Sequence, residues 1–329
     1  MLSRIYTRMC VAIFGALAAT TISNPSFAQR GQAEAFVKDR SQKAYVRKAS
    51  TKAAVTFIDS ANFGPADLLQ AKGAIVVRGI INDTPCYIMI DTGSDRTIVS
   101  EKLLPVLKYE KLIDGPLIRL SGSSLRSRTG AEFTLSVPKQ VSFSGPVLVA
   151  DISKFAGALG PPIGVILGMD YLSSTSILFQ FSKSRVYLSQ PGSIKPRQNV
   201  HVITLSESVG VPARVDGRDV QLTIDSGYNG AVRLFGKPSR GSAAAKQKEG
   251  RMELRPDGSL AKVSDRVSGT VQIGDLPVSS NDVIFGPGFA SKGDGLIGTR
   301  YLAQFDVIID YQGRTAAFVS SGASTTARY

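Results

Sequence analysis

The chain contains two copies of one pattern, and this internal repeat limits the possible folds more than any other feature. In each copy, two short β-type runs lead to Ile-Asp, which is followed by a hydroxyl residue and Gly. The first copy is residues 74–100 (AIVVRGIINDTPCYIMIDTGSDRTIVS), and the second is residues 211–234 (VPARVDGRDVQLTIDSGYNGAVRL). This alignment pairs Asp91 with Asp225. The fold must therefore use one structural unit twice.

A second pair of matching motifs lies downstream of the two copies. Residues 165–172 read VILGMDYL, and residues 295–302 read GLIGTRYL. Gly168 follows the first of the paired aspartates by 77 positions, and Gly298 follows the second by 73. Two unlike motifs that recur at nearly equal spacing indicate duplication, because chance matches would not keep their separation.

Both copies end in a pattern typical of a β-hairpin. Residues 177–188 and 305–319 each contain two β-type runs that flank a short polar turn. The chain also has 32 Gly, 16 Pro and no Trp, which suits many tight turns and a core of Val, Ile, Leu and Phe. The sequence therefore predicts an all-β fold with two similar lobes.

The repeat also sets the expected domain boundaries. We expect a first lobe at residues 71–189, a linker at 190–200 and a second lobe at 201–320, followed by a C-terminal tail at 321–329. Residues 29–70 are rich in Ala, Lys and Arg with weak helical periodicity. This basic segment is interpreted as a short helix, a disordered tail or a removable pro-segment.

The first 28 residues have the pattern of a secretory signal peptide. Two arginines precede an uncharged apolar run at residues 9–22, and Ser26-Phe27-Ala28 supplies the small residues of a cleavage site. The run is short for a membrane span, which needs about 20 residues. An uncleaved anchor is the alternative. The prediction is an exported protein, periplasmic or secreted.

Charge and composition narrow the possible partners. The formal net charge is +13, but no basic stripe is interleaved with aromatic residues as in a nucleic-acid surface. Weak association with an anionic membrane or envelope polymer is a minor hypothesis. His201 is the only His, and Cys86 is the only Cys left after signal removal. The sequence therefore predicts no metal site and no cofactor, and Cys86 is interpreted as a packing residue.

The repeated Ile-Asp-hydroxyl-Gly motif suits a pair of carboxyl groups. An apolar strand delivers the carboxylate to its end, and the Gly allows a sharp turn there. Two such loops that meet around a two-fold axis bring the carboxyls so close that both do not readily ionise. The pair then shares one proton, and it can activate a water molecule against a carbonyl group without a metal.

At these residues the chain resembles the aspartic protease clan, which includes pepsins and retroviral proteases. The matching motifs are IMIDTGS (88–94), LTIDSGY (222–228), VILGMDYL and GLIGTRYL. The resemblance covers both repeats and is closer to the retroviral type. It implies two β-barrel lobes related by a pseudo-two-fold axis, with the active site between them. One chain would then be a monomer that forms an intramolecular pseudo-dimer.

The resemblance also assigns roles to the residues of the two motifs. It makes Asp91 and Asp225 the catalytic carboxylates. Thr92 and Ser226 align with hydroxyls that form hydrogen bonds between the two loops. These four residues are the expected centre of the site.

The remaining residues of the motifs support this centre. Gly93 and Gly227 align with the turn glycines, and Ser94 with a position that often bonds the catalytic Asp. The counterpart of Ser94 is Tyr228, which departs from the family pattern. Substrate-covering flaps are expected at about residues 115–131 and 240–262.

The implied function is that of an exported aspartic endopeptidase, with a peptide or protein as its substrate. The alternative is a catalytically inactive relative that binds peptides or stabilises an envelope complex. A further variant is a dimer of chains that builds its site from two copies of Asp91.

Overall fold

The computed structural model describes residues 36–38, 46–48, 53–120, 123–196, 200–206, 210–236, 252–254, 260–262, 267–286 and 293–320. All of them belong to one compact unit, residues 35–329. The predicted signal peptide and C-terminal tail lie outside the described residues. Within the described ranges, no helix has the length and apolar character to cross a membrane.

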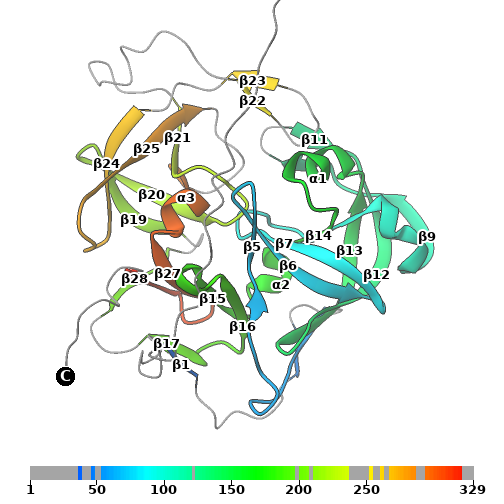
Figure 1. Cartoon of the computed structure of the whole chain (residues 1–329). Helices are drawn as coiled ribbons and strands as arrows, with labels where there is room; N and C mark the ends of the chain where they lie inside the picture. The colour runs from blue at the N-terminus through cyan, green and yellow to red at the C-terminus, as the bar shows by residue number, and fades with distance from the viewer. Residues whose placement is uncertain are drawn as a thin grey trace, which may run out of the picture. The chain divides into compact units, whose positions relative to one another are not determined.

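Six strands of the first repeat close into a barrel, drawn in cyan and green in Figure 1. They are β6 (Ala74–Ile81), β7 (Thr84–Ile90), β8 (Ile98–Ser100), β12 (Ser127–Val137), β13 (Val141–Ala150) and β14 (Ile163–Leu167). The order around the barrel is β13-β8-β14-β7-β6-β12, and β12 pairs with β13 to close it. The pairs β7–β14 and β8–β13 are parallel.

The second repeat forms a barrel with the same construction. Its strands are β19 (Gly210–Val215), β20 (Arg218–Asp225), β21 (Val232–Phe235), β24 (Val267–Ile273), β25 (Ser279–Gly286) and β26 (Gly295–Gly298). The order is β25-β21-β26-β20-β19-β24, with β20–β26 and β21–β25 parallel. Each strand therefore has a counterpart in the first barrel, and the predicted all-β fold with two lobes is confirmed.

One sheet of six strands contains the hairpins that end both repeats. Its members are β4 (Ala66–Asp67), β15 (Ser176–Gln180), β16 (Arg185–Ser189), β18 (His201–Thr204), β27 (Phe305–Asp310) and β28 (Thr315–Ser320). The order β18-β28-β27-β15-β16-β4 reads symmetrically from its centre, where β15 and β27 pair antiparallel. The two predicted hairpins thus meet edge to edge and join the lobes.

The first lobe begins earlier in the chain than the sequence predicted. Short strands precede the repeat, namely β1 (Phe36–Lys38), β2 (Val46–Lys48), β3 (Ala54–Phe57) and β5 (Leu69–Ala71), and β17 (Ile194–Pro196) pairs with β1. Strand β3 pairs with β13 of the barrel, and Val55 and Phe57 are buried. The alternating Ala-Val-Thr-Phe run of β3 buries every second side chain, so this part of the segment that precedes the repeat packs against the first barrel.

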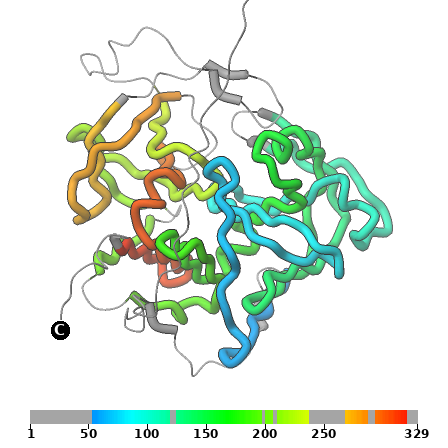
Figure 2. Tube along the Cα trace, in the orientation of Figure 1, coloured from blue at the N-terminus to red at the C-terminus, as the bar shows by residue number. Residues whose placement is uncertain are grey.

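Two small hairpins lie where the sequence predicted flaps. The first consists of β10 (Ile118–Leu120) and β11 (Ser123–Leu125), beside β9 (Lys108–Asp114), and the second of β22 (Met252–Leu254) and β23 (Leu260–Lys262). Figure 1 labels β11, β22 and β23, and Figure 2 traces the chain in the same orientation. Both fall inside the expected ranges 115–131 and 240–262.

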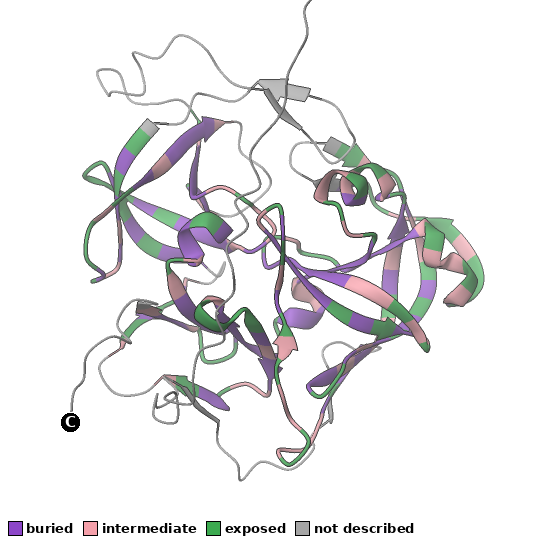
Figure 3. Cartoon of the chain, in the orientation of Figure 1, coloured by how far each residue is buried: buried purple, intermediate pink, exposed green. Residues whose placement is uncertain are grey.

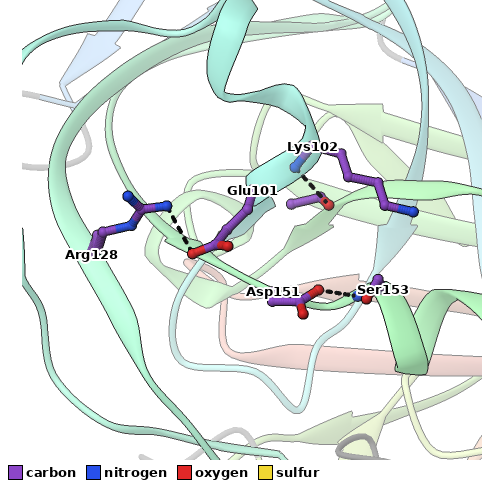
Figure 4. A network of polar contacts seen from close by, with 6 residues as sticks. Glu101, Lys102, Arg128, Asp151 and Ser153 are labelled. Atoms are coloured by element: carbon purple, nitrogen blue, oxygen red, sulfur yellow. Dashed lines mark hydrogen bonds and ion pairs between the residues drawn. The ribbon is translucent and has the colours of Figure 1, made fainter.

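Short helical segments fix the ends of the first-lobe strands. They are η1 (Glu101–Val106), α1 (Ser153–Leu159), α2 (Met169–Leu172) and η2 (Phe181–Lys183), and α3 (Thr299–Leu302) matches α2 in the second lobe. Figure 4 shows polar contacts near η1 and α1. Arg128 of β12 forms an ion pair with Glu101 (2.9 Å), and the Ser153 N–H donates to Asp151 (3.0 Å).

A single large apolar cluster runs through both repeats. It contains the alternate residues of the barrel strands, such as Ile88 and Ile90 in β7 and Leu222 and Ile224 in β20. Figure 3 shows buried residues along the barrel strands, interspersed with intermediate and exposed ones. The strands that lead to the two paired aspartates are therefore held rigidly by packing on their core side.

Candidate active site

The two paired aspartates lie at the ends of equivalent strands. Asp91 directly follows β7, and Asp225 is the last residue of β20. Strand β7 pairs in parallel with β14, which ends at Leu167 directly before Gly168, and Ile90 aligns with Leu167. Strand β20 pairs in parallel with β26, which ends at Gly298, and Asp225 aligns with Gly298. The Asp91 N–H donates to the Leu167 carbonyl (3.0 Å). The repeated downstream motif therefore fixes the strand end from which each carboxyl projects.

Four reciprocal hydrogen bonds join the two loops. The hydroxyl of Thr92 donates to the Ile224 carbonyl (2.7 Å) and accepts from the Ser226 N–H (3.0 Å). The hydroxyl of Ser226 donates to the Ile90 carbonyl (2.8 Å) and accepts from the Thr92 N–H (3.0 Å). Both hydroxyls are buried. Each loop therefore holds the other in place, in the arrangement that the resemblance implied for Thr92 and Ser226.

Each turn glycine packs against the carboxyl of the opposite loop. A Cβ atom on Gly93 would lie 2.4 Å from the carboxyl carbon of Asp225, and one on Gly227 would lie 2.6 Å from that of Asp91. No side chain fits at these distances, since real Cβ contacts do not come under 3.0 Å. The sequence predicted these glycines as turn residues, and the structure shows that they also make room for the carboxyl pair.

Burial and proximity change the ionisation of the two carboxyls. Burial raises the pKa of Asp91 well above its ordinary value, and the negative charge of Asp225 raises it further. Burial also raises the pKa of Asp225, to about 6. A hydrogen bond between the two groups raises the pKa of Asp91 and lowers that of Asp225. The pair therefore retains a shared proton at a pH where an isolated Asp is fully ionised.

Each carboxyl accepts hydrogen bonds from backbone N–H groups of the turn that follows it. Oδ1 of Asp225 accepts from the N–H groups of Gly227 (2.9 Å) and Tyr228 (3.0 Å). Oδ1 of Asp91 accepts from the Gly93 N–H (3.0 Å), and a backbone hydrogen bond from Ser94 also lowers the pKa of this carboxyl. Hydrogen bonds to an ionised oxygen stabilise its charge. Because the hydrogen bond between the two carboxyls lowers the pKa of Asp225 and raises that of Asp91, Asp225 is the better site for the negative charge of the pair.

Two residues near the site behave differently from their sequence-based interpretation. The hydroxyl of Ser94 donates to the Arg96 carbonyl (2.9 Å), while its backbone N–H donates to the Asp91 carbonyl (3.3 Å). Tyr228 supports Asp225 through its backbone N–H, so its side chain is not needed for this contact. In both loops, the hydrogen bonds to the Asp carboxyl therefore come from backbone N–H groups and not from the side chains of Ser94 and Tyr228.

Two further residues of the site were not singled out from the sequence. Tyr311, directly after β27, is buried, and burial and the nearby charges of Asp91 and Asp225 raise the pKa of its hydroxyl. Arg233 on β21 is buried, and its positive charge acts on Asp225. The strand registers align Arg233 with Ile98 of the first repeat, and the sequence motifs alone do not show this match.

The described residues support neither Cys86 as a nucleophile nor a site for a metal ion. Burial raises the pKa of Cys86 to about 12, which keeps the thiol protonated, and its Cβ packs close to Gly164. Within the described ranges, no cluster of three His, Cys, Asp or Glu side chains could hold a metal ion.

Comparisons with known proteins bear on the first repeat. Residues 77–171, from within β6 to within α2, match the family model for aspartyl proteases. This match confirms the resemblance drawn from IMIDTGS and VILGMDY. No curated protein matches the chain in sequence. Among solved structures, the chain is similar to the EIAV protease complexed with the inhibitor HBY-793, at 23% identity and a TM-score of 0.24, over 30% of this chain and 85% of that chain.

The hydrogen bonds between the loops predict a large effect of one substitution. Thr92→Val keeps the shape of the side chain but leaves the Ser226 N–H and the Ile224 carbonyl without their partner. We expect a loss of about 2–4 kcal/mol in the free energy of unfolding, measured by urea denaturation. Thr134→Val, at an exposed position of β12, is the control and should change it by less than about 0.5 kcal/mol. Equal effects of both substitutions would contradict this prediction.

The raised pKa of Asp225 predicts that its replacement stabilises the fold. A carboxyl whose pKa is raised in the folded state lowers stability as the pH rises from its unfolded pKa to its folded pKa, here from 3.8 to about 6. Asp225→Asn should therefore increase the free energy of unfolding by about 1–3 kcal/mol at pH 7.5 and by little at pH 4. Asp219→Asn, at an exposed ion pair with Arg214, is the control. The same gain at both pH values would refute the assignment.

Proposed function

We propose that this chain, whose residues 77–171 match the aspartyl protease family, is an exported aspartic endopeptidase that uses Asp91 and Asp225 as a catalytic pair. The single observation that carries the proposal is the reciprocal set of hydrogen bonds between Thr92 and Ser226, which brings two buried carboxyls into contact. The second repeat supplies the partner of Asp91. One chain therefore suffices, and a dimer built from two Asp91 residues is not required.

The geometry supports a water molecule as the nucleophile. Asp225, with two backbone N–H donors on Oδ1, takes a proton from the water as the oxygen attacks the peptide carbonyl carbon. Asp91 donates its proton to the carbonyl oxygen, so that a neutral gem-diol forms. The collapse of this intermediate breaks the C–N bond. The amine leaves with a proton from Asp225, and a hydroxyl proton of the gem-diol returns to Asp91.

The two hairpins at 118–125 and 252–262 support an extended peptide or protein segment as the substrate. Each is an antiparallel strand pair inserted between strands of its barrel in the sequence, at the position expected for a flap that covers a bound segment. A main chain held between them could form strand-like hydrogen bonds. Export to the periplasm or the exterior and weak affinity for anionic envelope surfaces are parts of the proposal that rest on the sequence alone.

The catalytic assignment is tested by peptide cleavage. The chain from Gln29 onward should cleave members of a random peptide library, and a statine-type inhibitor should block the cleavage. Asp91→Asn and Asp225→Asn should each lower kcat/KM at least about 1,000-fold, since each removes one half of the proton relay. Cys86→Ser is the control and should retain activity. Persistent cleavage by either Asn variant would exclude the pair, and folded protein without activity would favour the inactive peptide-binding alternative.

The ionisation of the pair predicts the pH dependence of this cleavage. The active form carries one proton on the pair, and a second proton binds as the pH falls through the pKa of Asp225, about 6. The profile of kcat/KM should therefore decline below about pH 6 and remain high at neutral pH, where Asp91 holds the shared proton. A maximum near pH 3–4 would contradict this ionisation scheme.

A further inference from the structure

One side chain of α2 reaches back to the loop that carries Asp91. The carboxyl of Asp170 accepts from the Thr97 N–H (3.0 Å) with one oxygen and from the Thr97 hydroxyl (2.6 Å) with the other. Thr97 is fully buried and lies directly before β8. Both oxygens of this carboxyl therefore hold one residue, which follows Asp91 by six positions (97 − 91).

The Thr97 hydroxyl connects Asp170 to the segment behind Asp91. It accepts from the Gly168 N–H (3.0 Å) while it donates to Asp170. A hydroxyl has a single hydrogen, so the carboxylate fixes its direction and leaves the oxygen lone pairs for the Gly168 N–H. The residue before Gly168 is Leu167, whose carbonyl accepts from the Asp91 N–H (3.0 Å). Hydrogen bonds thus lead from Asp170, through Thr97, to the segment that holds Asp91.

The Asp91 loop lies directly on this segment. The Met169 N–H donates to the Ser94 carbonyl (2.8 Å). A Cβ atom on Gly168 would lie 2.6 Å from the Arg96 carbonyl oxygen and 2.8 Å from that of Ser94. The loop and the segment are therefore in close backbone contact, and a shift of the end of the loop would move the residues between it and Asp91.

The second lobe connects its loop to the equivalent segment through main-chain groups. The Gly298 N–H donates directly to the Ala231 carbonyl (2.8 Å). Arg300 stands where the first lobe has Asp170, and its side chain forms an ion pair at the surface with Asp282 (2.8 Å). The first loop therefore depends on a carboxylate at a place where the second loop uses its backbone.

The ionised carboxyl fixes geometry at a cost to folding stability. Burial raises the pKa of Asp170, while the hydrogen bonds from Thr97 and the positive charge of Arg96 oppose this rise. Hydrogen bonds to a charged oxygen are shorter and stronger than neutral ones, and a pair of them sets an angle as well as a distance. The carboxylate therefore holds Thr97 more precisely than apolar packing would.

We propose that Asp170 is a positioning residue, which acts through Thr97 to hold the Asp91 loop where the Asp91 carboxyl can donate its proton to the peptide carbonyl. This inference rests on the proposed function and adds to it a residue outside the catalytic pair. A displacement of about 1 Å from the productive geometry can lower a rate about 100-fold. Binding of an extended substrate depends on the whole cleft, so the loss should fall on kcat rather than on KM.

Steady-state kinetics on a peptide that the wild-type chain cleaves test this role. Asp170→Asn and Thr97→Val should each lower kcat about 10–100-fold and change KM less than about 3-fold. Thr97→Ser keeps the hydroxyl, and its kcat should stay within about 3-fold of the wild-type value. An unchanged kcat in Asp170→Asn or in Thr97→Val, or a loss confined to KM, would overturn the proposal.

A double variant tests whether Asp170 acts through Thr97. Both substitutions remove the same connection, so Asp170→Asn combined with Thr97→Val should be no slower than the slower single variant. Multiplied losses would show two independent effects and would contradict the role of Thr97.

A second carboxylate–threonine contact in the chain provides the matched control. Asp216, in the turn between β19 and β20, accepts from the Thr270 N–H (2.8 Å) and hydroxyl (3.2 Å). This turn lies at the end of β20 opposite to Asp225. Asp216→Asn removes the same kind of contact away from the site and should leave kcat unchanged. An equal loss of kcat in Asp216→Asn would reduce the effect of Asp170 to a general one on the fold.

A carbon NMR titration of Asp91 separates this proposal from the proposed function, since it needs no cleavage. Burial and the contact with Asp225 raise the pKa of Asp91, so a displaced loop should bring this pKa down toward its ordinary value. Thr97→Val removes no charge, and it should lower the measured pKa of Asp91 by at least about 1, whereas Asp216→Asn should not change it.

The titration gives a result whether or not a peptide is cleaved. If no peptide is cleaved and the pKa of Asp91 falls in Thr97→Val, the peptidase assignment fails and the positioning role stands. If the pKa of Asp91 is the same in Thr97→Val and in the wild-type chain, the positioning role is refuted, whatever the activity.

Discussion

The hydrogen bonds between Thr92 and Ser226 are the constraint on which the rest of the structure depends. Each hydroxyl donates to a backbone carbonyl of the opposite loop and accepts from a backbone N–H of that loop, at distances of 2.7–3.0 Å. Both residues are buried. Neither loop could keep its shape alone, because the buried backbone groups of one loop are satisfied only by the other. The two barrels must therefore fold against each other.

The closeness of the carboxyls follows directly from this constraint. The loops approach until Gly93 lies against Asp225 and Gly227 against Asp91, where no side chain would fit. The carboxyls are then buried together, and the fold bears a cost that is reduced by one shared proton. A loss of folding stability of this kind is typical of active sites, where catalytic groups are kept in arrangements that destabilise the fold. The continuous core and the central β15–β27 pair are what stabilise this arrangement.

The two lobes share their strand order but not the residues along their strands. Met89, Ile166 and Ile98 form an apolar row across the first barrel, whereas Thr223, Leu296 and Arg233 form the equivalent row of the second. In a symmetric dimer of identical chains both rows would be the same. A duplication within one chain removes this limit, because each copy can change independently while the loop hydrogen bonds remain.

The sequence by itself determined the duplicated unit, the β class of the fold and the loop residues at its centre. These features are local: Ile-Asp-Thr-Gly and Ile-Asp-Ser-Gly need only a strand, a turn and a spacing to be recognised. The small hairpins β10–β11 and β22–β23 lie inside the ranges where flaps were expected. The sequence did not predict strand β3 before the repeat, since this short strand lies between β2 and the distant strand β13.

Only the tertiary structure decided which residues surround the carboxyl pair. Ile98 follows Asp91 by 7 positions (98 − 91) and Arg233 follows Asp225 by 8 (233 − 225), so a gapless alignment of the motifs does not bring Ile98 and Arg233 together. The pairing of β21 with β26 does so, because opposed residues of neighbouring strands must share a face. Support of Asp225 by a backbone N–H rather than by the side chain of Tyr228 was likewise decided by the turn geometry. Sequence patterns identify residues that act through their own strand or turn, whereas neighbours brought together by sheet register become visible only when the chain is folded.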